Sequence, residues 1–290
     1  MKKKAKVLIF GAYGFLGTRL KEFIQKKDVQ IFCQGRGANS DIAIDPVDES
    51  AVSELTKKIN PDLVLNLVAN TNVDQCEENY GDAFDANVVV VQNIAKAIRG
   101  KKSRLIHIST DHLYGGEGPH IENRIELVNK YAITKRIGEF AASQISSTIL
   151  RTNFIGKSKT VGRISFTDWL YDGLNTNKAL FLFSDVLFSP LYIEDLCSAV
   201  WIVMNNPSPG IFNLGSRGGI SKADFGIAFA KRLGFDTGNL ELREICKAKL
   251  LAKRPKDMRM NSTKFENTFG HILPTIWQTI EKCCQEYANG

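Results

Sequence analysis

Short runs of apolar residues alternate with longer amphipathic segments over the first 150 residues. The short runs are almost continuously apolar, as are strands buried on both faces of a parallel sheet, and the longer segments repeat their apolar positions at helical spacing. The pattern predicts strands at residues 6–10, 29–33, 41–44, 62–68, 104–109 and 147–151, and helices at 15–26, 49–59, 80–99 and 129–144. This order favours an α/β fold, a doubly wound parallel sheet with helices on both faces.

The pattern loosens after residue 151, where Gly, Asn and other polar residues become more frequent. Residues 191–204 are helix-like again and residues 211–214 are strand-like, so we expect the chain to leave the sheet, return once and leave again. A terminal helix is expected at 274–287. We therefore expect one domain formed by residues 1–154 with 191–214, and a smaller C-terminal lobe formed by 155–190 and 215–290.

Composition narrows the class of protein. The 290 residues are 43% hydrophobic and 24% charged, without repeats, which favours a soluble globular enzyme. The net charge of +7 fits either general solubility or an anionic ligand. Apart from Lys2, Lys3, Lys4 and Lys6, the basic residues are scattered, so we expect no nucleic acid as a partner. The six cysteines form no metal-binding spacing, and we interpret them as reduced thiols without a metal. No apolar run is long enough for a signal peptide or a membrane span, so we expect a cytoplasmic protein.

A glycine turn follows the first expected strand. Gly11, Gly14 and Gly17 stand in a GxxGxxG spacing between that strand and a helix. In such a unit, the first glycine permits the tight turn, the second lets the backbone approach a pyrophosphate, and the third packs the helix on the strand. The N–H groups at the helix start, Phe15 and Leu16, would bind the phosphate. This context predicts a dinucleotide site and a Rossmann fold.

The end of the second strand distinguishes the two nicotinamide cofactors. An acidic residue there would bond the ribose 2′-hydroxyl of NAD, whereas an arginine suits the 2′-phosphate of NADP. The sequence has no carboxylate at this point, and Arg36 follows the strand directly. We therefore predict NADP(H) as the cofactor, and leave use of NAD(H) open.

Three side chains are candidates for carbonyl reduction. Tyr131 and Lys135 are four residues apart in an expected helix and so share one face. Thr110 follows the strand at 104–109, at the edge where parallel sheets bind ligands. A tyrosine, with an ordinary pKa of about 10, needs a neighbouring ammonium when it donates a proton to an alkoxide. A threonine hydroxyl can hold the carbonyl oxygen, so we predict these three residues to be catalytic.

Five stretches of the sequence carry a family resemblance. They are the turn at 11–17, Ala-Asn-Thr-Asn-Val-Asp at 69–74, Ile-Ser-Thr-Asp at 108–111, the segment 131–139, and Arg-Pro followed by Arg-Met-Asn within 254–261. On these the chain resembles the extended short-chain dehydrogenase/reductases, and within them the dTDP-4-dehydrorhamnose reductases. The resemblance implies NADPH-dependent reduction of the C4 ketone of a nucleotide-linked 6-deoxy sugar, in rhamnose-type deoxysugar and surface polysaccharide biosynthesis.

The resemblance also implies which residues contact the cofactor. Asp45 and Asp48 match an Asp-x-x-Asp element and would lie near the adenine. Ala69 and Asn70 would line the cofactor, as would the catalytic tyrosine and lysine.

On the substrate side, the resemblance implies a second set of contacts. Thr71 and Val73 would touch the sugar, and Phe154 would lie against the sugar ring where the reductases often have Trp. Arg254 and Arg259 would address the substrate, including its diphosphate.

One departure from the family pattern bears on the reaction. Related dehydratases place a glutamate where His112 stands here, which argues against dehydration. Two alternatives stay open: a sugar-nucleotide epimerase that retains its cofactor, and a non-catalytic NADP-binding regulatory subunit. A homodimer is also left open. The loop at 115–129 fits a lid over the substrate and an ordinary surface loop equally well.

Overall fold

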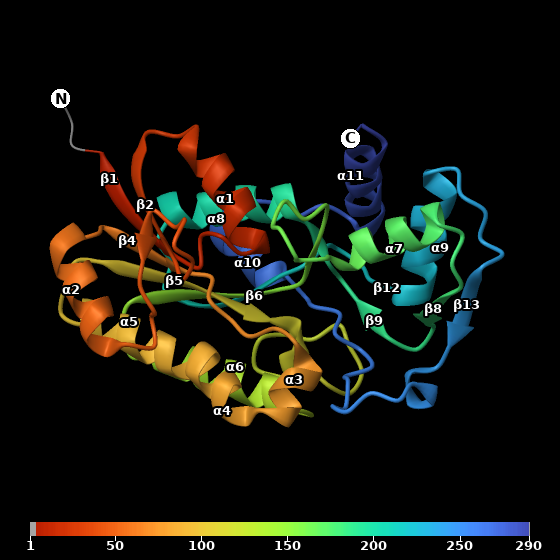
Figure 1. Ribbon diagram of the computed structural model, residues 1–290, viewed down its shortest axis with the longest axis horizontal. Coiled ribbons are helices and arrows are strands. Elements are labelled where there is room, and N and C mark those ends of the chain that lie inside the picture. The colour runs from red at the N-terminus through yellow and green to blue at the C-terminus, as the bar shows by residue number, and fades with distance from the viewer. Residues whose placement is uncertain (1–3, 290) are drawn as a thin grey trace. The chain divides into compact units, whose positions relative to one another are not determined.

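The computed structural model describes residues 4–289 and contains a seven-stranded sheet (Figure 1). Its strands stand in the order β11-β6-β5-β4-β1-β2-β3. They are β1 (Ala5–Phe10), β2 (Val29–Gly35), β3 (Ile42–Ala43), β4 (Leu63–Asn66), β5 (Arg104–Thr110), β6 (Ser147–Thr152) and β11 (Gly210–Leu214). The pairs β1–β2, β1–β4, β2–β3 and β4–β5 are parallel, which confirms the predicted α/β fold.

Helices cover both faces of this sheet, as the continuous apolar strands require. Figure 1 shows α2 (Glu49–Ile59), α5 (Val90–Ile98) and α6 (Lys130–Ala142) on one face. On the other face lie α1 (Phe15–Gln25) and the part of α8 (Ile193–Asn205) from Cys197 onward. A core of buried hydrophobic side chains, which include the fully buried Leu8, Val64 and Val91, joins the first face to its three helices.

The chain divides into two compact units. The first contains residues 1–110, 129–151 and 197–212, and the second contains 111–128, 152–196 and 213–290. The sequence analysis predicted the first boundary between domain and lobe at residue 154, and it gave no sign that 111–128 belongs with the second unit.

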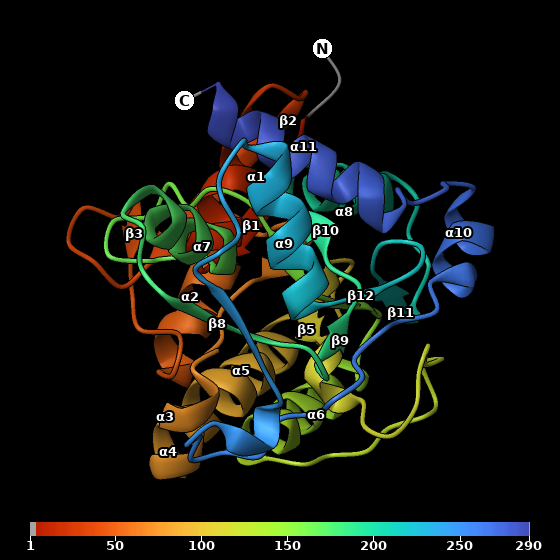
Figure 2. The ribbon, with the colours of Figure 1, turned by 90° about the vertical axis from the view of Figure 1, so that its right-hand side faces the viewer.

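The second unit is a smaller assembly of helices and paired strands. Its helices are α7 (Phe166–Asn175), α9 (Lys222–Arg232), α10 (Thr263–Phe269) and α11 (Ile276–Ala288), and Figure 2 shows α9 beside α11. Strand β8 (Leu180–Phe183) pairs with β13 (Leu240–Arg243), β9 (Leu187–Phe188) with β12 (Ile220–Ser221), and β7 (Phe154–Ile155) with β10 (Leu191–Tyr192). Aromatic side chains form much of its core, such as Phe229 against Tyr287 with ring centroids 5.4 Å apart.

Two predicted helices differ from the structure. The segment 80–99 is divided into α4 (Tyr80–Phe84), a π-helical turn (Asp85–Val89) and α5, and α3 (Val73–Glu78) precedes it. The segment 191–204 begins as strand β10, because its first two residues pair with β7, and becomes helical only at Ile193.

The terminal helix begins at Ile276, where a reciprocal capping box between Thr275 and Gln278 fixes its start.

The six cysteines, all within residues 4–289, form no disulfide, and only Cys246 among them is exposed. Within residues 4–289, no helix combines the length and the hydropathy that crossing a bilayer requires.

Candidate cofactor and catalytic site

The glycine turn is built for close approach of a ligand to the backbone. Gly11 has φ +78°, and a Cβ there would lie 3.0 Å from the amide nitrogen of Val68. A Cβ on Gly17 would lie 2.3 Å from the Gly11 carbonyl oxygen, so the fold itself requires these two glycines. Gly14 differs, because its Cβ would meet nothing closer than 3.5 Å. Space is therefore open beside Gly14 at the start of α1, where backbone N–H groups can receive a phosphate.

A buried glutamine holds this turn in place. The Gly11 N–H donates to Gln34 Oε1 at 3.1 Å, and Gln34 Nε2 donates to the carbonyl of Ile44 at 2.7 Å. Gln34 is only 1% exposed at the end of β2. It therefore ties the turn to the segment that follows β3. The sequence analysis missed this residue, although a polar side chain at the end of a buried strand is a usable signal.

Polar residues beyond β2 and β3 lie at the surface. Arg36 is exposed, and its guanidinium has no hydrogen-bond or ion-pair partner within the part of the chain that the structure describes. Asp45 is also exposed, and its carboxylate accepts from the Val47 N–H at 3.1 Å. Asp48 has a structural task, since it caps α2 through the Ser50 N–H at 2.8 Å. Arg36 is thus accessible to an anionic ligand.

The three predicted catalytic residues belong to the first unit and are all buried. Thr110 ends β5, and Tyr131 and Lys135 lie one turn apart near the start of α6. Their exposed fractions are 5%, 5% and 1%. The Lys135 ammonium donates to the carbonyl of Ile108 at 2.8 Å, which ties α6 to β5 two residues before the threonine.

Burial weakens the basicity of Lys135. It lowers the pKa of the ammonium to about 8, against an opposing effect of the Glu139 carboxylate one turn further along α6. His107 in β5 is also buried, and burial, followed by the charge of Lys135, holds its pKa well below the ordinary value. Asn66 Nδ2 lies 3.1 Å from His107 Nδ1 and acts as donor, because Asn66 Oδ1 already accepts from the Val68 N–H. A neutral imidazole therefore accompanies the lysine.

A fully buried ion pair lies behind the lysine. Arg151 in β6 donates from Nε and from Nη2 to the two carboxylate oxygens of Glu139, each at 2.7 Å, and both side chains are 0% exposed. Arg136 adds a third bond to Glu139 at 2.8 Å. Burial acts to raise the pKa of Glu139, but the hydrogen bonds and charge of Arg151 outweigh it and lower the pKa below its usual value. Glu139 therefore stays ionised one turn from the lysine.

Hydrogen bonds from the π-helical turn also hold α6 in place. Asn87 Oδ1 accepts from the Asn70 N–H at 2.9 Å, while Asn87 Nδ2 donates to the Asn70 carbonyl at 3.2 Å and to Thr134 Oγ1 at 3.0 Å. A Cβ on Gly138 would lie 2.3 Å from the Asn87 carbonyl oxygen, so the turn presses directly on α6. Asn87 thereby links the predicted cofactor segment at Ala69 and Asn70 to α6, which carries the predicted catalytic residues. The sequence analysis missed it.

The predicted substrate contacts are divided between the two units. In the first unit, Thr71 is exposed, and Val73 is 8% exposed at the first position of α3. In the second unit, Phe154 is half-buried in β7, where it pairs in register with Leu191 of β10.

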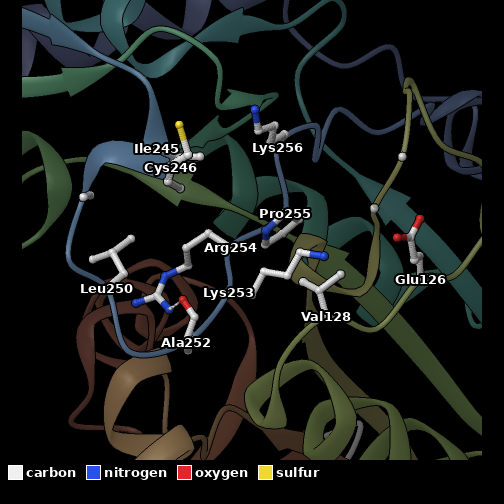
Figure 3. A pocket seen from close by; sticks show the side chains of 13 residues that line it. Glu126, Val128, Ile245, Cys246, Leu250, Ala252, Lys253, Arg254, Pro255 and Lys256 are labelled. Carbon is white, nitrogen blue, oxygen red and sulfur yellow. Dashed lines mark hydrogen bonds between the residues drawn. The ribbon is translucent and has the colours of Figure 1, made fainter.

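The two predicted arginines of the second unit have different surroundings. Arg254 is half-buried, donates to the Ala252 carbonyl at 2.9 Å, and lines a cavity of about 500 Å³ (Figure 3). Figure 3 shows it beside Leu250, with Glu126 at the far side of the cavity. Arg259 is engaged by a carboxylate, since its Nη2 lies 2.6 Å from Asp257 Oδ2. A substrate anion would have to compete with that carboxylate for Arg259.

Comparison with known proteins identifies the family of this chain. Residues 5–289 match the family described as RmlD substrate binding domain. The chain belongs to this family. The match confirms the resemblance on which the sequence analysis relied.

Curated relatives span most of the chain. A dTDP-4-dehydrorhamnose reductase of Sinorhizobium fredii is 30% identical over 94% of each chain. The spore coat polysaccharide biosynthesis protein SpsK of Bacillus subtilis is 28% identical over 82% of each chain.

Solved structures share the fold. A dTDP-4-dehydrorhamnose reductase from Bacillus anthracis, in complex with NADP, superposes with a TM-score of 0.89 at 22% identity, covering 98% of this chain and all of that one. WbmG of Bordetella bronchiseptica, in complex with NAD, gives 0.83 at 19% identity, covering 99% of this chain and 95% of that one.

Proposed function

We propose that this protein is an NADPH-dependent reductase of a 4-keto sugar nucleotide, of the dTDP-4-dehydrorhamnose reductase type, working in the cytoplasm in deoxysugar and surface polysaccharide biosynthesis. The observation that carries the proposal is the buried pair Tyr131 and Lys135 on α6, bonded to β5 just before Thr110, in the same unit as the glycine turn. The names of the relatives support the substrate class.

The residues of the first unit fit a dinucleotide. The open space beside Gly14 and the start of α1 would take the pyrophosphate. The accessible Arg36 suits a ribose 2′-phosphate, which favours NADP(H) over NAD(H). Asp45 would lie toward the adenine, and Ala69 and Asn70 would line the cofactor. When bound, reduced nicotinamide supplies the hydride that the carbonyl carbon accepts.

The side chains of this protein supply the proton and hold the carbonyl. The Thr110 hydroxyl donates a hydrogen bond to the carbonyl oxygen, and Tyr131 donates the proton that this oxygen takes up as it becomes a hydroxyl. Lys135, with a pKa of about 8, is predominantly cationic at neutral pH and stabilises the phenolate that remains. Its bond to Ile108 and the ionised Glu139 hold that charge in place.

Other residues would bind the rest of the substrate. We assign sugar contacts to Thr71, Val73 and Phe154, and contacts with the charged part of the substrate to Arg254. Arg259 would bind the substrate anion as well only if its hydrogen bond to Asp257 were replaced by one to that anion.

The test is NADPH consumption, followed by absorbance at the nicotinamide band with dTDP-4-keto-6-deoxymannose and other 4-keto sugar nucleotides. Tyr131→Phe should lower turnover by about 10²- to 10⁴-fold, as loss of a general acid does. Tyr80→Phe, at an exposed tyrosine, is the matched control and should leave turnover unchanged.

Other outcomes would favour the alternatives. Interconversion of sugar epimers with no net NADPH consumption would indicate an epimerase. Binding of NADPH without turnover of any sugar nucleotide would indicate a regulatory subunit and would refute the proposal.

A further inference from the structure

A buried histidine in β5 has no part in the proposed reaction. His107 stands in register with Asn66, the last residue of β4, in the parallel pair that the two strands form. Residues in register in neighbouring parallel strands point to the same face of the sheet. Both side chains are 0% exposed. Asn66 and His107 therefore form a buried polar pair inside the first unit.

The hydrogen bonds of Asn66 fix the orientation of this pair. Asn66 Oδ1 accepts from the Val68 N–H at 3.1 Å, so Asn66 Nδ2 is the donor to His107 Nδ1, also at 3.1 Å. A neutral imidazole that accepts at Nδ1 carries its proton on Nε2. The histidine thus serves Asn66 as an acceptor, and Asn66 serves the Val68 backbone as an acceptor.

The residues that follow Asn66 form a wall of the glycine turn. The Leu67 N–H donates to the carbonyl of Phe10 at 3.0 Å. A Cβ on Gly11 would lie 3.0 Å from the amide nitrogen of Val68 and 3.1 Å from the carbonyl carbon of Leu67. This backbone therefore lies directly against the residue that makes the tight turn, and the bond from the Val68 N–H to Asn66 helps to hold it there.

Packing alone gives no reason for a histidine at this position. His107 Nε2 is buried and has no hydrogen-bond partner among residues 4–289. A buried donor without a partner destabilises the folded protein, and an apolar side chain of similar size would carry no such donor. What the imidazole supplies is the acceptor that Nδ1 offers to Asn66.

We propose that His107 is a positioning residue for the dinucleotide. By accepting from Asn66 Nδ2, it holds the Asn66 amide in the orientation that binds the Val68 N–H, and so keeps the segment after β4 against Gly11. The turn is then already ordered when the cofactor binds, which lowers the entropy lost on binding. The inference rests on the proposed function for the identity of the cofactor, and it assigns His107 no contact with that cofactor.

The test compares two substitutions of nearly the same shape. His107→Asn keeps an acceptor, because its amide oxygen can stand where Nδ1 lies, whereas His107→Leu has a similar branched outline and no acceptor. Binding of NADPH and of dTDP is measured by calorimetry, each ligand alone, and thermal unfolding of each variant is recorded. If the wild type binds NADH more tightly than NADPH, the same comparison is made with NADH.

The acceptor should decide the affinity for the dinucleotide. His107→Leu should raise the Kd of NADPH by about 10-fold, the size of one lost hydrogen bond, and His107→Asn should keep it within about 3-fold of the wild type. The Kd of dTDP should be the same in all three proteins. A residue that only fills space would give the opposite order, since leucine suits a buried site better than asparagine.

A second measurement needs only the wild type. Long-range proton–nitrogen NMR correlations of the histidine ring at pH 7 should show His107 protonated at Nε2 and unprotonated at Nδ1. A proton on Nδ1 would overturn the inference even if His107→Leu failed to fold.

Two binding results would also overturn the inference. The first is an equal Kd of NADPH for the wild type and His107→Leu, and the second is an equal loss of affinity in His107→Leu and His107→Asn. Because no reaction is measured, these outcomes are separate from failure of the proposed function. A wild type that binds NADPH but consumes none with any keto sugar would lose the reductase assignment and keep the role of His107, if the two variants differ as stated. A wild type that binds neither NADPH nor NADH would refute both.

Discussion

Removing Arg151 tests how α6, the helix that carries Tyr131 and Lys135, is held in place. The substitution Arg151→Met leaves the Glu139 carboxylate 0% exposed without its bidentate partner. Breaking a buried pair from one side costs about 3–5 kcal/mol, because the remaining charge stays desolvated. Arg136 still reaches Glu139 at 2.8 Å and is 38% exposed, so we expect a loss of about 3 kcal/mol, at the lower end.

The assay is urea unfolding at pH 7, with the free energy of unfolding compared at constant m value. The double variant Glu139→Leu/Arg151→Met removes both charges and should recover most of the loss, since apolar replacements of a buried pair are often neutral. The exposed pair Arg232 and Glu281, at 45% and 47%, provides the control, and Arg232→Met should cost less than about 1 kcal/mol. A loss below about 1 kcal/mol in Arg151→Met, or a double variant no more stable than the single one, would refute this reasoning.

Three further predictions concern cofactor binding and pH. The kcat/KM of the reductase should fall as pH rises through about 8, because Lys135 loses its proton there. Glu139→Gln should move this fall to lower pH, because the Glu139 carboxylate raises the pKa of Lys135. A pH–rate profile that is unchanged in Glu139→Gln would contradict the role of Glu139. Arg36→Ala should raise the Kd of NADPH by about 10-fold or more and change the Kd of NADH by less than about 3-fold, as measured by fluorescence titration. Equal effects on the two cofactors would show that Arg36 does not contact a 2′-phosphate. Gly17→Ala should lower both the Tm and the affinity for NADPH, because its Cβ would lie 2.3 Å from the Gly11 carbonyl oxygen. Gly14→Ala should weaken NADPH binding and leave the Tm nearly unchanged, because space is open beside Gly14. A lowered Tm in Gly14→Ala would contradict that open space.

Features that depend on local spacing could be predicted from the sequence. The glycines at 11, 14 and 17 lie within one strand–turn–helix unit, and Tyr131 and Lys135 lie one turn apart in one helix. Continuous apolar strands predicted the parallel sheet for the same reason, since each strand carries its own burial signal.

Features that depend on pairing between distant segments could not be predicted. Asn87 bonds Thr134, 47 positions away, and Gln34 bonds Gly11, 23 positions away. The π-helical turn at Asp85–Val89 contains no Gly or Pro that would mark it in a helical pattern.

The central claim is that a carbonyl of a nucleotide sugar receives the hydride of NADPH at this site. The most direct test uses NADPH deuterated at the transferred position of the nicotinamide, with dTDP-4-keto-6-deoxymannose as substrate and NMR of the product. The account predicts one deuterium at C4 of the sugar for each NADPH consumed. Deuterium at another carbon, or product formed with no deuterium and no loss of NADPH, would contradict it.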